Sequence, residues 1–319
     1  MEQIPYVEGL HRLTKSIYAY LLPDGSWGNS NAGFVYNESE SLIIDTLYDL
    51  NLTGRFKEKM EKVTGAGKTA KYLVNTHANG DHFFGNELFE GSEIIASRAC
   101  AAEMHDMLPG KMATFSRIHY LLGGAGSYFH KHFRQFHFRG IKPRLPSMTF
   151  SGKIELNTGK LTVQLIEVGP AHTKGDIMVF IPEEKVLFAA DIVFINVTPI
   201  VWAGPMINCI NACNLILDMD VDIIVPGHGP VTDKAGVERI KAYYEYVDRE
   251  ARLRYERGMN ILNAALDIDL KEFGQWSGPE KLVANVAALY RELKPESKPL
   301  SPLKIFNLIS QYKKKKGFK

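Results

Sequence analysis

Cysteine is scarce in this sequence, and no long stretch is wholly apolar. The 319 residues include three cysteines, Cys100, Cys209 and Cys213. An odd and sparse set excludes a disulfide-framed secreted module and suits a reducing compartment. No segment approaches the roughly 18 uninterrupted apolar residues of a membrane span. The first residues also lack the basic-then-apolar pattern of a secretory signal. We therefore expect a cytoplasmic location and no membrane contact.

Charge of neither sign is in excess. The chain has 38 Lys and Arg against 36 Asp and Glu, a formal net charge of +2. A protein that binds nucleic acid through a basic surface would show a clear excess of positive charge, so we expect no nucleic-acid partner. With 45% apolar and 23% charged residues, the composition is typical of a globular protein. The length fits two domains, or one large domain with an appendage.

Short apolar runs, broken by Gly, Asn and Pro, fill most of the first two thirds of the sequence. Residues 33–36 and 42–45 flank a polar turn and predict a hairpin. Residues 51–63 have helical spacing, with Asn51 as the expected cap. Later runs are short and bounded by residues that break regular structure, which favours buried strands over helices. These runs are 72–74, 93–96, 161–166, 177–181, 186–190 and 223–225.

Two regions have helical patterns. Residues 98–147 are dense in His, Phe, Tyr and Met and interrupt the series of strands, which predicts a helical insertion. Its aromatic residues either pack on the main body or form an apolar lid over a cleft. From residue 233 onward the pattern is helical again. Residues 279–293 place apolar side chains on one face, which must be buried in the chain itself or in a homodimer. These side chains are Leu282, Val283, Val286, Leu289 and Tyr290.

Residues with metal-binding chemistry occur at four places, each where an apolar run ends and a turn with Gly or Pro begins. If the runs are neighbouring strands, their ends converge and the loops direct these side chains into one cleft. Imidazole and carboxylate groups suit Zn, Fe or Mn without any thiolate. Each residue alone is more simply a turn or core residue, whereas the four places together predict a metal centre. They hold His77, Asn79, Asp81 and His82; His172; Asp191; and His228.

The order of these residues resembles the metallo-β-lactamase-fold hydrolases, whose first motif is usually His-x-His-x-Asp-His. The resemblance covers roughly residues 10–232 and includes Asp45, the Gly-Asp pair at 175–176 and Gly227-His228-Gly229. It implies an α+β fold, an αββα sandwich with the metal site at one edge, and within the family it is nearest to the glyoxalase II-like branch. We therefore expect a catalytic domain over 1–232, including the insertion 98–147, and a C-terminal helical extension over 233–319.

The resemblance also assigns the ligands. His77, the residue at 79 and His172 would form the first metal site, Asp81, His82 and His228 the second, and Asp191 would bridge them. Asn79 stands where the family has histidine, and an amide oxygen is a weaker ligand for Zn²⁺ than imidazole. Three alternatives stay open: two metals with a weakened first position, one metal in the second site, or a chain without catalysis. The expected cofactor is Zn²⁺, one or two per chain, with Fe or Mn as alternatives.

The implied function is that of a metal-dependent hydrolase acting on an ester, thioester, lactone or amide bond of a small molecule. A bound metal lowers the pKa of its water towards about 7 and polarises the substrate oxygen. Asp81 would orient the nucleophile or accept its proton. Asp45 and Thr76 are candidates to fix the histidine tautomers. The alternatives are an iron-dependent oxidoreductase of the same fold, a nuclease of this fold, against which the balanced charge argues, and a non-catalytic binding protein.

Overall fold

Two β-sheets form the centre of the molecule. The computed structural model describes residues 4–37, 40–296 and 298–317. One sheet has the strand order β1-β2-β3-β4-β5-β6-β7, and the other has the order β12-β11-β10-β9-β8. The strands are β1 (Gly9–Arg12), β2 (Ile17–Leu21), β3 (Ala32–Asn37), β4 (Glu40–Ile44), β5 (Tyr72–Val74), β6 (Glu93–Ser97), β7 (Met148–Phe150), β8 (Lys153–Thr158), β9 (Leu161–Glu167), β10 (Ile177–Ile181), β11 (Val186–Phe194) and β12 (Ile223–His228).

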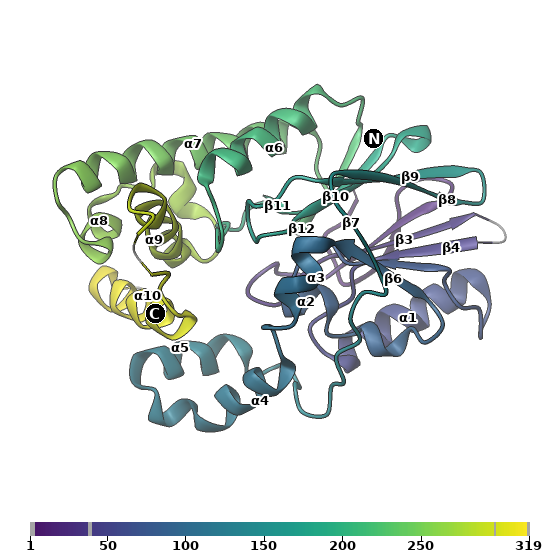
Figure 1. Ribbon diagram of the computed structural model, residues 1–319, viewed down its shortest axis with the longest axis horizontal. Coiled ribbons are helices and arrows are strands. Elements are labelled where there is room, and N and C mark those ends of the chain that lie inside the picture. Colours follow the sequence, from purple (N-terminus) through teal and green to yellow (C-terminus); the bar gives the residue numbers. More distant parts are fainter. Residues whose placement is uncertain (1–3, 38–39, 297, 318–319) are drawn as a thin grey trace.

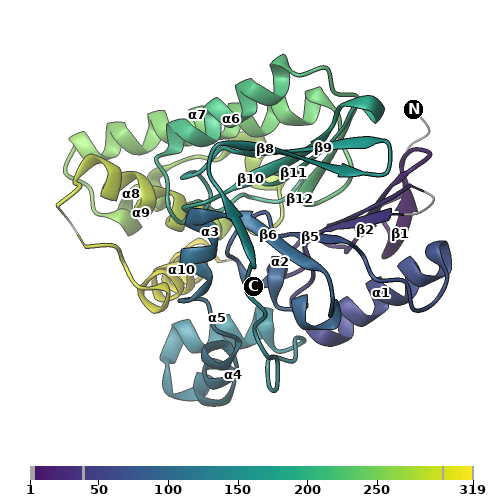
Figure 2. The same ribbon diagram turned by 45° about the vertical axis from the view of Figure 1, so that its right-hand side comes forward.

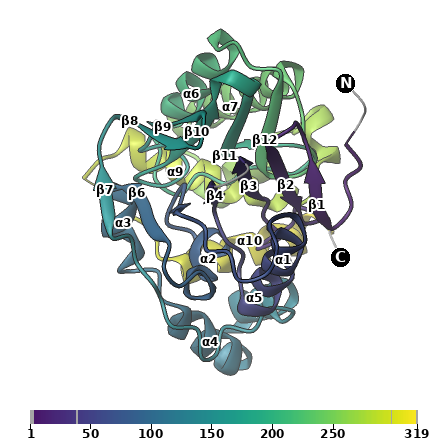
Figure 3. The same ribbon diagram turned by 90° about the vertical axis from the view of Figure 1, so that its right-hand side faces the viewer.

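Helices cover the outer faces of both sheets. In Figure 1, α6 and α7 lie above the five-stranded sheet, and α1, α2 and α3 lie below the seven-stranded sheet. Figure 3 shows the same layers from the side. The helices are α1 (Leu50–Thr64), α2 (Gly80–Phe83), α3 (Arg98–Met104), α4 (Pro109–Ile118), α5 (Gly123–Phe133), α6 (Met206–Asp218), α7 (Lys234–Glu256), α8 (Ile261–Asp267), α9 (Leu282–Leu293) and α10 (Pro302–Lys316). The αββα sandwich predicted from the sequence is confirmed.

The core between the sheets is built from the inward-facing residues of both. Val35 and Ile44 of the first sheet pack in one apolar cluster with Val179 and Phe188 of the second. Gly33 on β3 faces Phe188, and a Cβ at this position would overlap the Phe188 ring. The absence of a side chain at residue 33 therefore lets the two sheets approach closely at this point.

The strand predictions hold, with differences at the ends. The hairpin β3–β4 is antiparallel as expected, whereas β1, β2, β7 and β8 were not predicted, because short and partly polar runs give a weak pattern. The expected cap of the first helix was wrong. Asp49, not Asn51, is the N-cap of α1, and its side chain accepts from the backbone N of Leu52 at 2.8 Å. β11 continues to Phe194, so Asp191 lies within that strand rather than at its end.

The helices of residues 98–147 and those after residue 233 meet on one side of the sandwich. Helix α5 packs against α10, and α9 packs against α7, α8 and α10 (Figure 2). Four residues of the predicted apolar face, Leu282, Val283, Val286 and Leu289, are buried within the chain. This face is therefore covered without a second copy, and the homodimer stays an untested prediction, as does the division into domains at residue 232. Among the described residues, no helix has both the length and the apolar character required to cross a bilayer.

Candidate metal centre

All seven predicted ligands lie close together. They come from five segments of both sheets, at the edge where β5, β9 and β12 end. His77 and Asn79 follow β5, and Asp81 and His82 lie in the short helix α2; His172 lies between β9 and β10, Asp191 in β11, and His228 is the last residue of β12.

Asp191 is at the centre of this group. Its carboxylate oxygens lie 3.2 Å from Nε2 of His172, 3.3 Å from that of His82, 3.4 Å from that of His228 and 3.7 Å from that of His77. All five side chains are buried. Four imidazole rings therefore point the same ring nitrogen at one carboxylate.

Asp45 fixes the orientation of two of these rings. Nδ1 of His82 donates to Asp45 Oδ2 at 2.8 Å, and Thr76 Oγ1 donates to the same oxygen at 2.6 Å. The Thr76 hydroxyl can then accept from Nδ1 of His77, which lies 3.0 Å away. Both rings thus carry a hydrogen on Nδ1, and in their neutral form they present a lone pair at Nε2. The sequence analysis named Asp45 and Thr76 as candidates to fix the histidine tautomers, and both contact the rings at Nδ1 or through each other.

Backbone carbonyls hold the other two rings in the same tautomer. Nδ1 of His228 donates to the carbonyl oxygens of Gly25 and Asn29, each at 3.1 Å. Nδ1 of His172 donates to the carbonyl oxygen of Ile200 at 2.6 Å. A carbonyl can only accept, so Nε2 of each neutral ring is an acceptor as well.

This arrangement suits a divalent cation. Lone pairs that face carboxylate oxygens in a buried site repel each other unless a positive charge lies between them. His77 Nε2, His82 Nε2 and Asp191 Oδ1 are buried and make no hydrogen bond. The edges of a tetrahedron of zinc ligands are about 3.3 Å long, close to the separations around Asp191. Two groups of three could hold an ion, His77, His82 and Asp191 in one, and Asp81, His82 and His228 in the other.

The charges of the site act strongly on each other. Burial raises the pKa of Asp191, but attraction from the four imidazoles outweighs it, so the pKa of this carboxyl lies well below its usual value. Burial and repulsion from His82 hold the pKa of His77 well below 6.5. His82 differs, because attraction to Asp191 and Asp45 overcomes burial and raises its pKa well above 6.5. Positive charge is therefore favoured next to His82, between the two carboxylates.

The side chain of Asn79 is hydrogen-bonded to one of the imidazoles. Its side-chain nitrogen, Nδ2, donates a hydrogen bond of 2.9 Å to Nε2 of His172. The lone pair of His172 is thus already used by a neutral amide. His172 belongs to neither of the two groups of His and Asp residues that could hold an ion, whereas Asp81, His82 and His228 form one of them.

The backbone around the carboxylates is unusual. Asp45 and Ala190 have φ values of 60° and 46°, in the left-handed region that residues with a side chain rarely adopt. The pairing of β11 with β12 shifts register on both sides of Ala190, which turns Asp191 towards the histidines. A Cβ at Gly227 would overlap the Asp191 carboxylate. The position of the central aspartate thus depends on a bulge in one strand and a glycine in its neighbour.

Two further residues near the site have structural roles. Asp176 accepts from the backbone N of Ala171 and of Thr173, and so shapes the loop that carries His172. Asn86 donates to Asn75 at 2.8 Å and to the carbonyl of Arg144, which is a role in turn structure rather than in catalysis.

Most of the aromatic side chains of residues 98–147 are buried. The buried set, which packs in the main core, consists of Tyr128, Phe129, Phe133, Phe136 and Phe138. Tyr120 stands apart, with 72% of its surface exposed. Trp27 connects the insertion to the site region, because its Nε1 donates to the Tyr128 hydroxyl at 2.7 Å. Packing on the main body thus accounts for most of these aromatic residues, and the lid stays a prediction.

The sequence analysis missed two residues near the site. Trp202 is one, and its backbone N donates to the carbonyl of His172 at 2.8 Å. Lys281 is the other; it is 3% exposed, and the charges of Asp191 and Asp81 act on it. Neither residue has a sequence signal, since a single lysine at the start of an amphipathic helix normally faces solvent.

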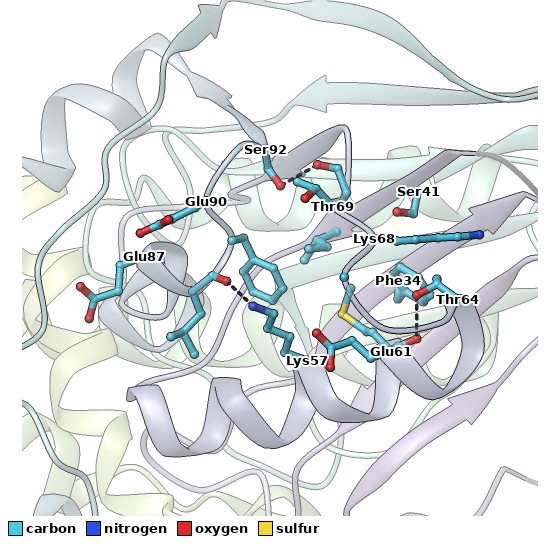
Figure 4. Close-up of a pocket in the computed structure, with 16 residues that line it drawn as sticks. Phe34, Ser41, Lys57, Glu61, Thr64, Lys68, Thr69, Glu87, Glu90 and Ser92 are labelled. Carbon is cyan, nitrogen blue, oxygen red and sulfur yellow. Dashed lines mark hydrogen bonds between the residues drawn. The ribbon is translucent and has the colours of Figure 1, made fainter.

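A cavity away from the metal centre offers no comparable chemistry. It has a volume of about 320 Å³ and lies beside α1, with charged residues of both signs around it (Figure 4). Lys57 donates to the carbonyl of Leu88 at 3.0 Å. Lys68 lies over the ring of Tyr36, 5.8 Å from its centroid. Because its lysines already have partners, this cavity is a weaker candidate site than the buried histidine cluster.

The family of the chain follows from its sequence match. Residues 25–228 match the metallo-beta-lactamase superfamily, and the chain belongs to that superfamily. The matched range includes all seven predicted ligands. Members of this superfamily typically bind divalent metals, which agrees with the His and Asp groups found here.

Known proteins resemble the chain over most of its length. The Beta-lactamase-like protein 2 homolog of Caenorhabditis elegans is 22% identical over 260 residues, which are 81% of this chain and 74% of that protein. The sec-alkylsulfatase Pisa1 from Pseudomonas sp. has a TM-score of 0.68 at 14% identity and covers 93% of this chain. The chain spans about half of that enzyme, 53%. A metallo-beta-lactamase from Pontibacter korlensis has a TM-score of 0.55 at 16% identity, over 74% of this chain and 98% of its own. These structures share the fold.

Proposed function

We propose that this chain is a metal-dependent hydrolase that cleaves an ester, thioester, lactone or amide bond of a small molecule. The observation that carries the proposal is the convergence of four imidazole Nε2 atoms on Asp191, with His77 Nε2, His82 Nε2 and Asp191 Oδ1 left without hydrogen bonds. Membership of the superfamily supports a hydrolytic reaction. The resemblance supports the bond type and the glyoxalase II-like branch, the imidazole and carboxylate groups support zinc, and the sparse cysteines support a cytoplasmic location.

We propose one metal per chain, held by Asp81, His82, His228 and Asp191. The hydrogen bond from Asn79 to Nε2 of His172 supports this count, because it removes one nitrogen from the other site. When bound, such an ion supplies a water of lowered pKa and polarises a substrate oxygen.

Asp81 is the proposed catalytic residue. Its carboxylate lies 3.5 Å from Nε2 of His228, and it is 8% exposed, more than any of the histidines of the cluster. A carboxylate that reaches both the ligand cluster and solvent is suited to orient the attacking water and to accept its proton. Asn79 is partly exposed beside it and can donate to the substrate with its remaining amide hydrogen.

Elemental analysis of protein purified without chelators tests this proposal first. We expect about one zinc per chain, and loss of that zinc in His228→Ala. His105→Ala is the matched control, because this imidazole is exposed at the end of α3, outside the cluster. Loaded protein is then assayed on a panel of esters, thioesters and lactones, with Asp81→Asn expected to reduce kcat. Iron in place of zinc, together with oxygen uptake, would support the oxidoreductase alternative. No metal under any supplementation would contradict a catalytic metal centre.

A further inference from the structure

The side chain of Lys281 is buried but has no ion-pair partner. It lies in the short 3₁₀ turn Pro279–Lys281 that leads into α9, and it is 3% exposed. Within the described part of the chain, its ammonium group has no hydrogen bond or ion pair to a protein group, and Nζ is not among the polar atoms that are fully closed off from solvent. Its contact is with the face of Trp27, with Nζ 4.8 Å from the ring centroid. Burying an ammonium without a hydrogen-bonded counter-charge is costly, so this arrangement calls for a reason.

The neighbouring acid does not supply that counter-charge. Glu280 accepts a hydrogen bond of 3.1 Å from the Tyr128 hydroxyl and lies 3.5 Å from Nζ of Lys313 on α10. Lys313 thus has the carboxylate partner, and Lys281 has only an aromatic face. A cation–π contact attracts the ammonium but gives it no hydrogen-bond acceptor.

Lys281 packs against the loop that holds one of the imidazoles of the metal centre. The loop that carries Trp27 also supplies the two carbonyls, of Gly25 and Asn29, that hold the His228 ring. The Trp27 ring also lies 6.2 Å from that of Trp202, whose backbone N donates to the carbonyl of His172. Burial lowers the pKa of Lys281 to about 8, against the attraction of Glu280, Asp191, Asp81 and Asp24. Two of the carboxylates of the metal centre are thus close enough to act on this ammonium.

We infer that Lys281 binds an anionic group of the substrate and thereby selects substrates with a carboxylate, phosphate or sulfate close to the bond that is cleaved. This inference rests on the proposed function. A divalent ion held by Asp81 and Asp191 would neutralise these two carboxylates, so the ammonium would keep only the attraction of Glu280 and Asp24, neither of which forms an ion pair with it. An anion that reaches Nζ would form a charge-assisted hydrogen bond in a place where water competes little. The C-terminal helical segment therefore contributes a specificity-determining residue to the site.

Thiols with and without a carboxylate test this inference without any need for turnover. The probes are mercaptoacetate, 3-mercaptopropionate and 4-mercaptobutyrate, each paired with its methyl ester, because a thiolate binds zinc and the chain length samples the distance to Nζ. Dissociation constants for the zinc-loaded full chain are measured by tryptophan fluorescence and by calorimetry. At one length or more, we expect the acid to bind about tenfold or more tightly than its ester.

Variants then assign that preference to one ammonium. Lys281→Met is expected to bind acid and ester equally, and Lys281→Arg to keep part of the preference. Lys313→Met is the matched control, since it removes a lysine of the same region that already has a carboxylate, and it should keep the whole preference. Lys281→Gln is a second neutral variant if the methionine variant does not fold, with folding checked by thermal melting.

The outcomes separate the two proposals. An equal affinity for acid and ester at every length in the natural chain, or an unchanged preference in Lys281→Met, overturns the role of Lys281 and leaves the metal centre intact. Failure of both zinc and all the thiols to bind overturns the proposed function, and the role of Lys281 with it.

Discussion

Replacing Lys281 by methionine should make the protein more stable at neutral pH. The fold lowers the pKa of this group from 10.5 to about 8, chiefly by burial. Below pH 8 the lysine is charged in both states, so folding carries the full cost of burying the ammonium. A lowering of this size corresponds to about 3 kcal/mol of unfolding free energy, since one pKa unit is worth about 1.4 kcal/mol. Methionine keeps a flexible apolar stem of similar length and removes the charge.

The sign of the pH dependence follows from the same values. Between about pH 8 and 10.5 the unfolded chain binds the proton and the folded chain does not, so the stability of the natural chain rises with pH. Lys281→Met lacks this gain. Its advantage should therefore be about 3 kcal/mol at pH 7 and should shrink towards zero near pH 10.5. Urea unfolding in the presence of a chelator measures both proteins under identical conditions. A destabilised variant at pH 7, or a difference that does not change with pH, would refute the argument.

Three further predictions concern the metal centre. Asn79→His should raise the zinc content from about one to about two per chain, because the amide no longer occupies the neighbouring imidazole; an unchanged content contradicts the single-metal proposal. Asp45→Asn should weaken zinc binding about 10- to 100-fold in a chelator competition, with an unchanged circular dichroism spectrum. Gly227→Ala should lose zinc, because its methyl group overlaps the central carboxylate, whereas Gly54→Ala, in open space on α1, should keep it. If Gly227→Ala keeps its zinc, the prediction is wrong, and β11 can shift to make room for the methyl group.

The resemblance to the metallo-β-lactamase-fold proteins implied the sandwich, and the positions of the His and Asp residues predicted which side chains converge in it. Short apolar runs with breakers at both ends predicted the buried strands. The ligands were predictable because each chemical group stands next to such a run, as His228 does after residues 223–225. Asp45 and Thr76 were predictable for the same reason. Asp45 directly follows β4, and Thr76 is the second residue after β5.

What the sequence did not predict depends on contacts between distant segments. Lys281 lies 53 residues after His228, and it is buried by contacts with segments distant in the sequence, such as the loop of Trp27 and α10. The hydrogen bond between Asn79 and His172 joins residues 93 positions apart. The bulge at Ala190 has no sequence signature, because alanine does not favour the left-handed conformation that it adopts there.

The order of the candidate ligands along the chain determines when the proposed metal site can be completed during synthesis. His77 is made early and His228 is made 228 − 77 = 151 residues later. A nascent chain therefore exposes histidines and aspartates long before a complete site exists, and any ion held then has fewer ligands. The proposed site is complete only after β12 has been synthesised and has paired with β11. Because an ion that binds the folded state alone stabilises it, uptake of the proposed metal would be a late step that favours the completed fold.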